Sequence, residues 1–145
     1  MNRLSSLAWI QKMRETVPDY LARLSRQDQP GRFIPCLTGA TPTGLAAGLG
    51  FSCFALKTYY TTGLWDSVPA RDRAAWTAYL KSFQRGRSFL HDRYHYNAFI
   101  DGPVLAAVRR QAPLHERIRQ RLFPPARLTE VQRLLIAETK QAIAT

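Results

Sequence analysis

The histidines are the residues whose spacing first suggests chemistry. His91 and His95 stand at i and i+4 in the segment His-Asp-Arg-Tyr-His, a spacing that puts two imidazoles on one side of a helix. Zinc proteases bind their metal through such a pair, and His115 could supply a third ligand. Asp92 stands where those proteases have a longer glutamate, and the segment reads as a loop. We therefore predict a hydrogen-bonded loop with stacked aromatic rings rather than a zinc site, and no cofactor.

The same loop, from Arg87 to Gly102, is rich in aromatic and polar side chains. Loops held between rigid elements commonly carry binding residues, because their side chains can converge without disrupting the core. We predict that a ligand or partner would bind here, through His91, Asp92, Tyr94, His95, Tyr96, Asn97 and Asp101.

A glycine-rich segment offers a second kind of chemistry. The run from Thr43 to Gly50 fits the Thr-Gly-x-x-x-Gly-x-Gly pattern of short-chain dehydrogenases, in which glycines let the backbone approach a cofactor pyrophosphate. The context of that fold is missing, because Pro35 interrupts the preceding segment and no second strand with an acidic end follows. We interpret these glycines as sites of close helix packing.

Charge provides the third candidate. The chain has 21 Lys and Arg against 10 Asp and Glu, a formal charge of +11. Such an excess fits an anionic partner such as nucleic acid, although a solvated helical face or a biased codon usage explains it as well. Aromatic side chains are not interleaved with the arginines, so single strands are not specially indicated. The predicted polyanion-binding cluster is Arg109, Arg110, Arg117, Arg119, Arg121 and Arg127.

Length and composition predict one helical domain spanning residues 1–145. A chain with 46% apolar residues can bury a substantial core. Cys36 and Cys53 lie among apolar neighbours, as buried thiols do, and no secretory context favours a disulfide. The apolar run from Leu4 to Ile10 is too short for a signal peptide. We therefore expect a cytoplasmic protein.

One uncharged stretch, from Phe33 to Leu56, is long enough to cross a membrane. Gly44 and Gly48 have the small-xxx-small spacing of packed transmembrane helices. Two prolines and several polar residues keep the mean hydropathy of the stretch modest, and a buried helix explains it without lipid. We therefore do not expect a membrane span.

The periodicity of apolar residues predicts helices throughout, with no alternating β-branched run. The first runs from Leu4 to Leu24, with Pro18 expected to kink or divide it. Apolar residues surround the axis from Leu45 to Thr61, which predicts a fully buried inner helix. A further helix is expected after Ser67 and Pro69, with an apolar face formed by Trp76, Tyr79, Leu80 and Phe83. Two short helices are expected to begin at Pro103 and at Pro113. The last helix is expected to begin at Thr129, which forms a capping box with Gln132.

Two segments resemble each other. Tyr20-Leu21 is followed by Gln27, Gly31 and Phe33, and Tyr79-Leu80 is followed by Gln84, Gly86 and Phe89. In each, a helix ends, the Gln can bond its exposed backbone, the Gly turns the chain and the aromatic fills the next interface.

The first of these segments, Gln-Asp-Gln-Pro-Gly-Arg-Phe at 27–33, resembles the Gln-x-x-x-Gly-x-Trp element of the terpenoid cyclase and protein prenyltransferase α/α-toroid group. Residues 76–84 are similar to the outer helix and turn of the same repeats. The resemblance implies consecutive antiparallel helical hairpins that form about half a toroid. Such a half toroid could be an incomplete form, an open arc or part of a homo-oligomer, or the missing hairpins could be supplied downstream.

The resemblance does not extend to the chemistry, because the aspartate-rich motif of the cyclases and the zinc ligands of the prenyltransferases are absent. We predict a non-catalytic or incomplete toroid-like module that binds a ligand or protein partner through the loop of residues 91–101. The alternatives are a basic helical protein associated with nucleic acid, and a fragment of a toroid enzyme acting on isoprenoid or polysaccharide substrates.

Overall fold

The structure is a computed structural model that describes residues 3–85, 97–111 and 129–145, with side chains from residue 8 onward. Within these residues the chain is mainly helical and forms no strand. Its β-type pairing there is limited to two isolated bridges, Ser25 with Phe33 and Gln84 with Phe99. The predicted all-α fold is confirmed. No helix of this part of the chain is long and apolar enough to cross a membrane.

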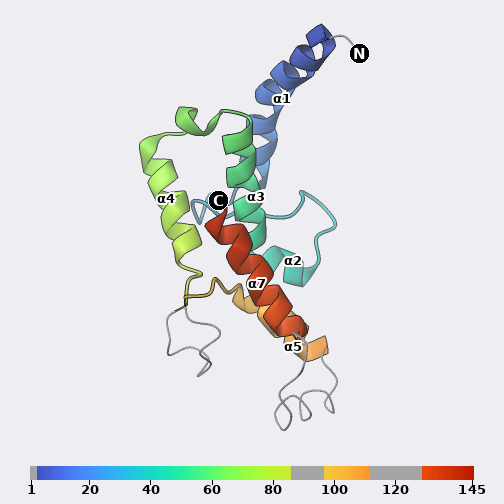
Figure 1. Cartoon of the computed structure of the whole chain (residues 1–145), viewed down its shortest axis with the longest axis vertical. Helices are drawn as coiled ribbons and strands as arrows, with labels where there is room; N and C mark the ends of the chain where they lie inside the picture. Colours follow the sequence, from blue (N-terminus) through green and yellow to red (C-terminus); the bar gives the residue numbers. More distant parts are fainter. Residues whose placement is uncertain (1–2, 86–96, 112–128) are drawn as a thin grey trace.

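Figure 1 shows the helices in chain order: α1 (Arg3–Leu24), α2 (Pro42–Ala46), α3 (Leu49–Thr61), the 3-10 helix η1 (Trp65–Ser67), α4 (Ala70–Lys81), α5 (Gly102–Gln111) and α7 (Glu130–Ile143). The helices predicted near α1, α4, α5 and α7 are confirmed. The capping box of α7 is also present, because the Thr129 and Gln132 side chains each bond the other's backbone N–H. The helix predicted from Pro113 and the turn predicted at Gly86 lie outside the described residues, although α4 itself already ends at Lys81.

α1 continues through Pro18, so the chain is not divided there. A proline inside a helix removes one backbone hydrogen bond. The turn that follows is held by packing, since Leu21 and Leu24 are buried in the core. Burial of this last part of α1 therefore outweighs the local cost of the proline.

The predicted helix over Leu45–Thr61 is wrong in two respects. The chain leaves the helical conformation at Ala47, so that α2 and α3 are separate helices with Gly48 as the N-cap of α3. α3 is also not buried all round, because Phe54 is 62% exposed and Tyr60 is 75% exposed. Apolar composition alone did not distinguish a buried face from one left uncovered.

The main core lies between α1, α3 and α4. Phe33 is 1% exposed, and its ring meets Trp76 edge to face with centroids 5.3 Å apart. Trp76 also packs against the rings of Tyr59 and Trp65. A second, smaller cluster joins α5 to α7 and consists of Ala98, Ile100, Leu105 and Leu135. Phe33 thus fills a helix interface, as the sequence predicts. Cys36 and Cys53 are free thiols; Cys53 is buried, as predicted, whereas Cys36 is only partly buried.

Two parts of the chain, which we call units, share the same backbone pairing. After α1, Ile34 N donates to Leu24 O at 3.0 Å; after α4, Ile100 N donates to Phe83 O at 2.9 Å. The bridge therefore places Phe99, not Phe89, at the position of Phe33. Gln27 is exposed and takes no part in this pairing, so its predicted bond to the helix end is wrong.

A side-chain bond repeats as well. Phe33 N donates to Ser52 Oγ on α3 at 3.2 Å, and Phe99 N donates to Thr139 Oγ1 on α7 at 3.1 Å. The first unit is therefore α1, α2 and α3, and the second unit is α4, α5 and α7. Equivalent helices touch, since α2 contacts α5 and α3 contacts α7. In Figure 1, α3 and α7 run upward while α1 and α4 run downward, so the two units share the same order of helix directions.

Candidate functional site

Most of the predicted ligand loop lies outside the described residues. This holds for His91, Asp92, Tyr94, His95 and Tyr96, and for His115, so the less favoured zinc site lies there too. Of the remaining two residues, Asn97 is exposed with a positive φ of 58°, as a turn residue. Asp101 lies in the interior, at 1% exposure.

Asp101 belongs to the second unit, and its side chain contacts the start of α3 in the first unit. Its Oδ2 accepts hydrogen bonds from Gly48 N at 2.7 Å and Leu49 N at 2.9 Å, the first amides of that helix. Those amides have no partner inside the helix, and the helix dipole adds positive potential there, so a carboxylate is favoured at this point. Asp101 therefore caps α3 of the first unit from the second unit.

This cap also explains why the glycine-rich segment is not a phosphate site. The amides of Gly48 and Leu49, which would meet a pyrophosphate, already bond Asp101. Gly48 lies directly against the Tyr79 hydroxyl, and a Cβ there would overlap it. The interpretation of these glycines as points of close helix packing is thus confirmed for Gly48 alone, because a Cβ at Gly50 would meet nothing within 4 Å and the neighbours of Gly44 are Thr41 and Pro35.

A second carboxyl group stands beside this cap. Glu138 Oε2 on α7 accepts a hydrogen bond from Asp101 N at 3.1 Å. Burial, and to a lesser degree the nearby Asp101 carboxylate, raise the pKa of Glu138 to about 7, although the bond from Asp101 N opposes the shift. The contact between the units therefore contains a carboxyl group that gains and loses its proton near neutral pH.

The raised pKa of Glu138 predicts a pH-dependent stability. The folded protein holds the Glu138 proton more tightly than the unfolded chain does, so protonation of Glu138 stabilises the fold. This contribution is complete below the unfolded pKa of about 4.5 and is lost as pH rises through the folded pKa of about 7. We expect Glu138→Gln to gain thermal stability relative to the wild type between pH 5 and pH 8, measured as Tm by circular dichroism. Glu130→Gln changes an exposed glutamate of the same helix and should run parallel to the wild type. A constant Tm difference for Glu138→Gln would contradict the prediction.

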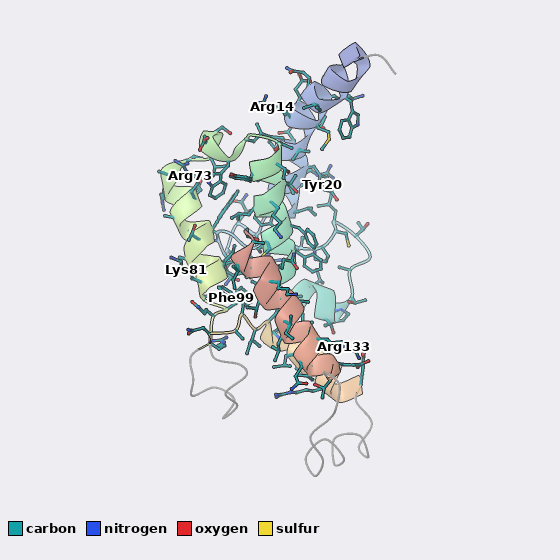
Figure 2. All side chains as sticks on the ribbon, viewed as in Figure 1. Arg14, Tyr20, Arg73, Lys81, Phe99 and Arg133 are labelled. Carbon is teal, nitrogen blue, oxygen red and sulfur yellow. The ribbon has the colours of Figure 1, made fainter. Side chains whose placement is uncertain are left out.

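The described arginines of the predicted cluster gather at one end of the molecule. Arg109 and Arg110 are exposed in the last turn of α5. Arg133, which was not among the arginines predicted from the sequence, is exposed in the first turn of α7. Figure 1 shows the end of α5 and the start of α7 at the lower end of the molecule, where Figure 2 labels Arg133. We call these three residues the arginine end.

The packing of α5 on α7 creates the arginine end. Leu105 and Leu135 are buried together, with Val131 against them, which fixes the two helices side by side. No ion pair to a carboxylate involves these three arginines within the residues that the structure describes. Arg117, Arg119, Arg121 and Arg127 lie between the two helices in sequence and outside the described residues.

A local signal for Arg133 is present in the sequence. It follows the Thr129 capping box by one turn, so its position at the start of α7 was predictable. What the sequence did not show is that this start lies beside the end of α5. The Asp101 cap had no comparable signal, because its partners are backbone amides more than 50 residues away.

No protein-family model, no curated protein and no solved structure matches the chain. The resemblance to α/α-toroid proteins therefore stays a prediction. The same holds for the ligand-binding loop and for the fragment of a toroid enzyme.

Proposed function

We propose that this protein binds nucleic acid through the phosphate backbone, with the arginine end as the contact surface. The observation that carries the proposal is the convergence of Arg109, Arg110 and Arg133, exposed and without a carboxylate partner in the described part of the chain, at one end of the molecule. Guanidinium groups match phosphate geometry and keep their charge at any physiological pH.

The charge distribution along the sequence supports the same surface. Residues 103–133 contain seven of the 17 arginines and only two carboxylates, Glu116 and Glu130. Two of the chain's acidic groups are withdrawn from the surface elsewhere, since Asp101 is buried and Glu138 is partly buried. The segment that supplies the arginine end therefore has a local excess of positive charge, which favours an anionic partner.

Recognition through this surface would be independent of sequence. Arginines that contact phosphates fix position and orientation but carry no base information. The exposed faces of α5 and α7 show no base-reading motif. We therefore expect salt-sensitive binding to duplexes of unrelated sequence with similar affinity.

The test is a titration of fluorescent duplexes with the wild type and a triple variant, Arg109→Ala/Arg110→Ala/Arg133→Ala, over a series of salt concentrations. Removing one arginine that binds a phosphate should reduce the slope of log affinity against log salt by about one unit, so the triple variant should reduce it by about three. The matched control, Arg14→Ala/Arg23→Ala/Arg71→Ala, removes the same charge from exposed positions on α1 and α4. Equal reductions in the two triple variants would show that only net charge matters and would contradict the proposed surface.

A further inference from the structure

Two carboxyl groups from different elements meet inside the protein, beside the start of α3. Asp101 precedes α5 and is 1% exposed, and Glu138 comes from α7 and is partly buried. Asp101 N donates to Glu138 Oε2 at 3.1 Å. Because only two carbon atoms separate that nitrogen from the carboxyl carbon of the same aspartate, the two carboxyl groups are neighbours. We call Asp101 and Glu138 the carboxyl pair.

One oxygen of the carboxyl pair is buried without a hydrogen-bond donor. Asp101 Oδ2 accepts from Gly48 N and Leu49 N, whereas Asp101 Oδ1 accepts no hydrogen bond within the described residues. The Tyr79 hydroxyl interacts with Asp101 electrostatically but does not bond Oδ1. A buried acceptor without a donor is costly, and native structures usually supply one. Beside Oδ1, the Glu138 carboxyl becomes a donor when it is protonated.

The surroundings of the carboxyl pair decide which group holds a proton. The two amides at the start of α3, with the helix dipole, favour Asp101 as a carboxylate. Burial, and to a lesser degree the Asp101 carboxylate, raise the pKa of Glu138 to about 7. The proton therefore belongs to Glu138. One oxygen of the protonated group can donate to Asp101 Oδ1 while the other accepts from Asp101 N.

The neighbours of Glu138 do not compensate a negative charge on it. Two titratable groups face it, Asp101 and the Cys53 thiol of α3, and neither is a cation. The cations of the helices around it form no ion pair with it within the part of the chain that the structure describes: Lys57 on α3, Arg109 and Arg110 on α5, and Arg133 and Lys140 on α7. Ionised Glu138 thus places a second negative charge beside Asp101 in the interior.

The same part of α7 covers the middle of α3. Gln141 Nε2 donates to Gly50 O at 3.1 Å, and Thr145 lies at the Cys53 thiol, on which Glu138 also acts. Cys53 is 0% exposed as a result. Movement of α7 away from α3 would therefore expose this thiol to solvent.

We propose that a proton on Glu138, donated to Asp101 Oδ1, keeps α7 against α3, and that its loss lets α7 separate while the core between α1, α3 and α4 stays folded. Separation hydrates the ionised Glu138 and moves it away from the Asp101 carboxylate, which relieves the repulsion between them. The contact between the two units is thereby sensitive to pH near neutrality. This proposal does not depend on the binding of nucleic acid.

The test measures the exposure of Cys53 with a thiol reagent. A Cys36→Ser background leaves Cys53 as the only cysteine of the chain. The modification rate of the folded protein, divided by the rate of the denatured protein at the same pH, gives the opening constant at Cys53. This division removes the pH dependence of the thiol itself, because both rates require the thiolate.

We expect the opening constant to rise about tenfold between pH 6 and pH 8. This factor follows from a pKa of Glu138 of about 7 when α7 is in place and of about 4.5 when it has separated. The opening constant should also exceed the constant for global unfolding, measured by denaturant titration at each pH, because the core stays folded when α7 separates.

Three variants in the same background identify the proton and its acceptor. Glu138→Gln should give a low opening constant that does not change with pH, since its amide donates to Oδ1 and has no proton to lose. Asp101→Asn should also show no change between pH 6 and pH 8. Its oxygen is needed by the α3 amides, so its amide nitrogen replaces Oδ1 and favours ionised Glu138 at both pH values. Glu130→Gln, at an exposed position of α7, should keep the tenfold rise.

Four results would overturn the proposal. These are an opening constant that does not change with pH, an opening constant equal to that of global unfolding, a tenfold rise that persists in Asp101→Asn, and equal behaviour of Glu138→Gln and Glu130→Gln. The third result would mean that Asp101 Oδ1 does not accept the Glu138 proton.

Discussion

Replacing Asp101 with alanine is expected to lower the free energy of unfolding by about 3 kcal/mol, because it leaves two buried amide donors without an acceptor. The amides are those of Gly48 and Leu49, which bond Asp101 Oδ2 at 2.7 and 2.9 Å. Asp101→Asn keeps an acceptor oxygen but loses the charge that the helix dipole favours, so its effect should be smaller. Chemical denaturation followed by tryptophan fluorescence measures both.

Asp66→Ala is the matched control for this prediction. Asp66 is an aspartate whose side chain is 96% exposed and pairs with Arg73 at the surface. Surface pairs contribute little, so this variant should change the free energy of unfolding by less than about 0.5 kcal/mol. Equal effects at Asp101 and Asp66 would show that the interior cap does not hold the two units together.

Gly31→Ala is expected to destabilise the protein by about 3 kcal/mol, through backbone strain of about 1–2 kcal/mol and overpacking of a similar size. Gly31 has a φ of 88°, a conformation that alanine rarely adopts. A Cβ there would also stand 2.7 Å from the Trp76 Cα, a backbone atom that has little freedom to move. Both costs arise from the turn that closes the first unit.

Gly63→Ala separates the two costs. Gly63 has a φ of 69°, but a Cβ there would meet nothing within 4 Å. This variant should therefore show the backbone strain alone, about 1–2 kcal/mol, in the same denaturation experiment. A destabilisation at Gly31 no larger than that at Gly63 would contradict the close contact between this turn and α4.

The helices were largely predictable from the sequence, because their signals are local. Helical periodicity located α1 and α4, and Thr129 with Gln132 located the start of α7. The break at Gly48 was not predictable in the same way, since it depends on Asp101 and Tyr79 from the second unit. Exposure of Phe54 and Tyr60 likewise depends on which faces of α3 have a neighbour.

The repeat was detectable from the sequence, but its alignment was wrong both for the Gln and for the second phenylalanine, because the bridges place Gln84 at the position of Ser25 and not of Gln27. Tyr20-Leu21 and Tyr79-Leu80 are equivalent in the structure, because they precede the same backbone bridge. The second phenylalanine was assigned to Phe89, whereas the bridge uses Phe99. The loops enclosed by the two bridges differ in length, and a fixed spacing along the sequence does not reveal that difference.

The sequence predicted the arginine-rich composition of the candidate site but not its position on the surface of the molecule. The sequence shows many arginines between residues 103 and 133, but it does not show which of them are exposed on the same surface of the molecule. The burial of Leu105 against Leu135 brings Arg133 to the end of α5, and this contact joins residues distant in sequence. Asp101 is the opposite case: the sequence predicts it as a residue of the binding loop, but its side chain is buried and contacts the start of α3.

The most direct test of the proposed function is a protection experiment on the unmodified protein. An arginine-selective reagent such as phenylglyoxal is applied with and without a saturating duplex at low salt, and the modified positions are identified by mass spectrometry. We predict that the duplex protects Arg109, Arg110 and Arg133 and leaves the exposed Arg14, Arg23 and Arg71 reactive. Equal protection of both groups, or protection of the second group alone, would contradict the assignment of the arginine end as the surface that binds nucleic acid.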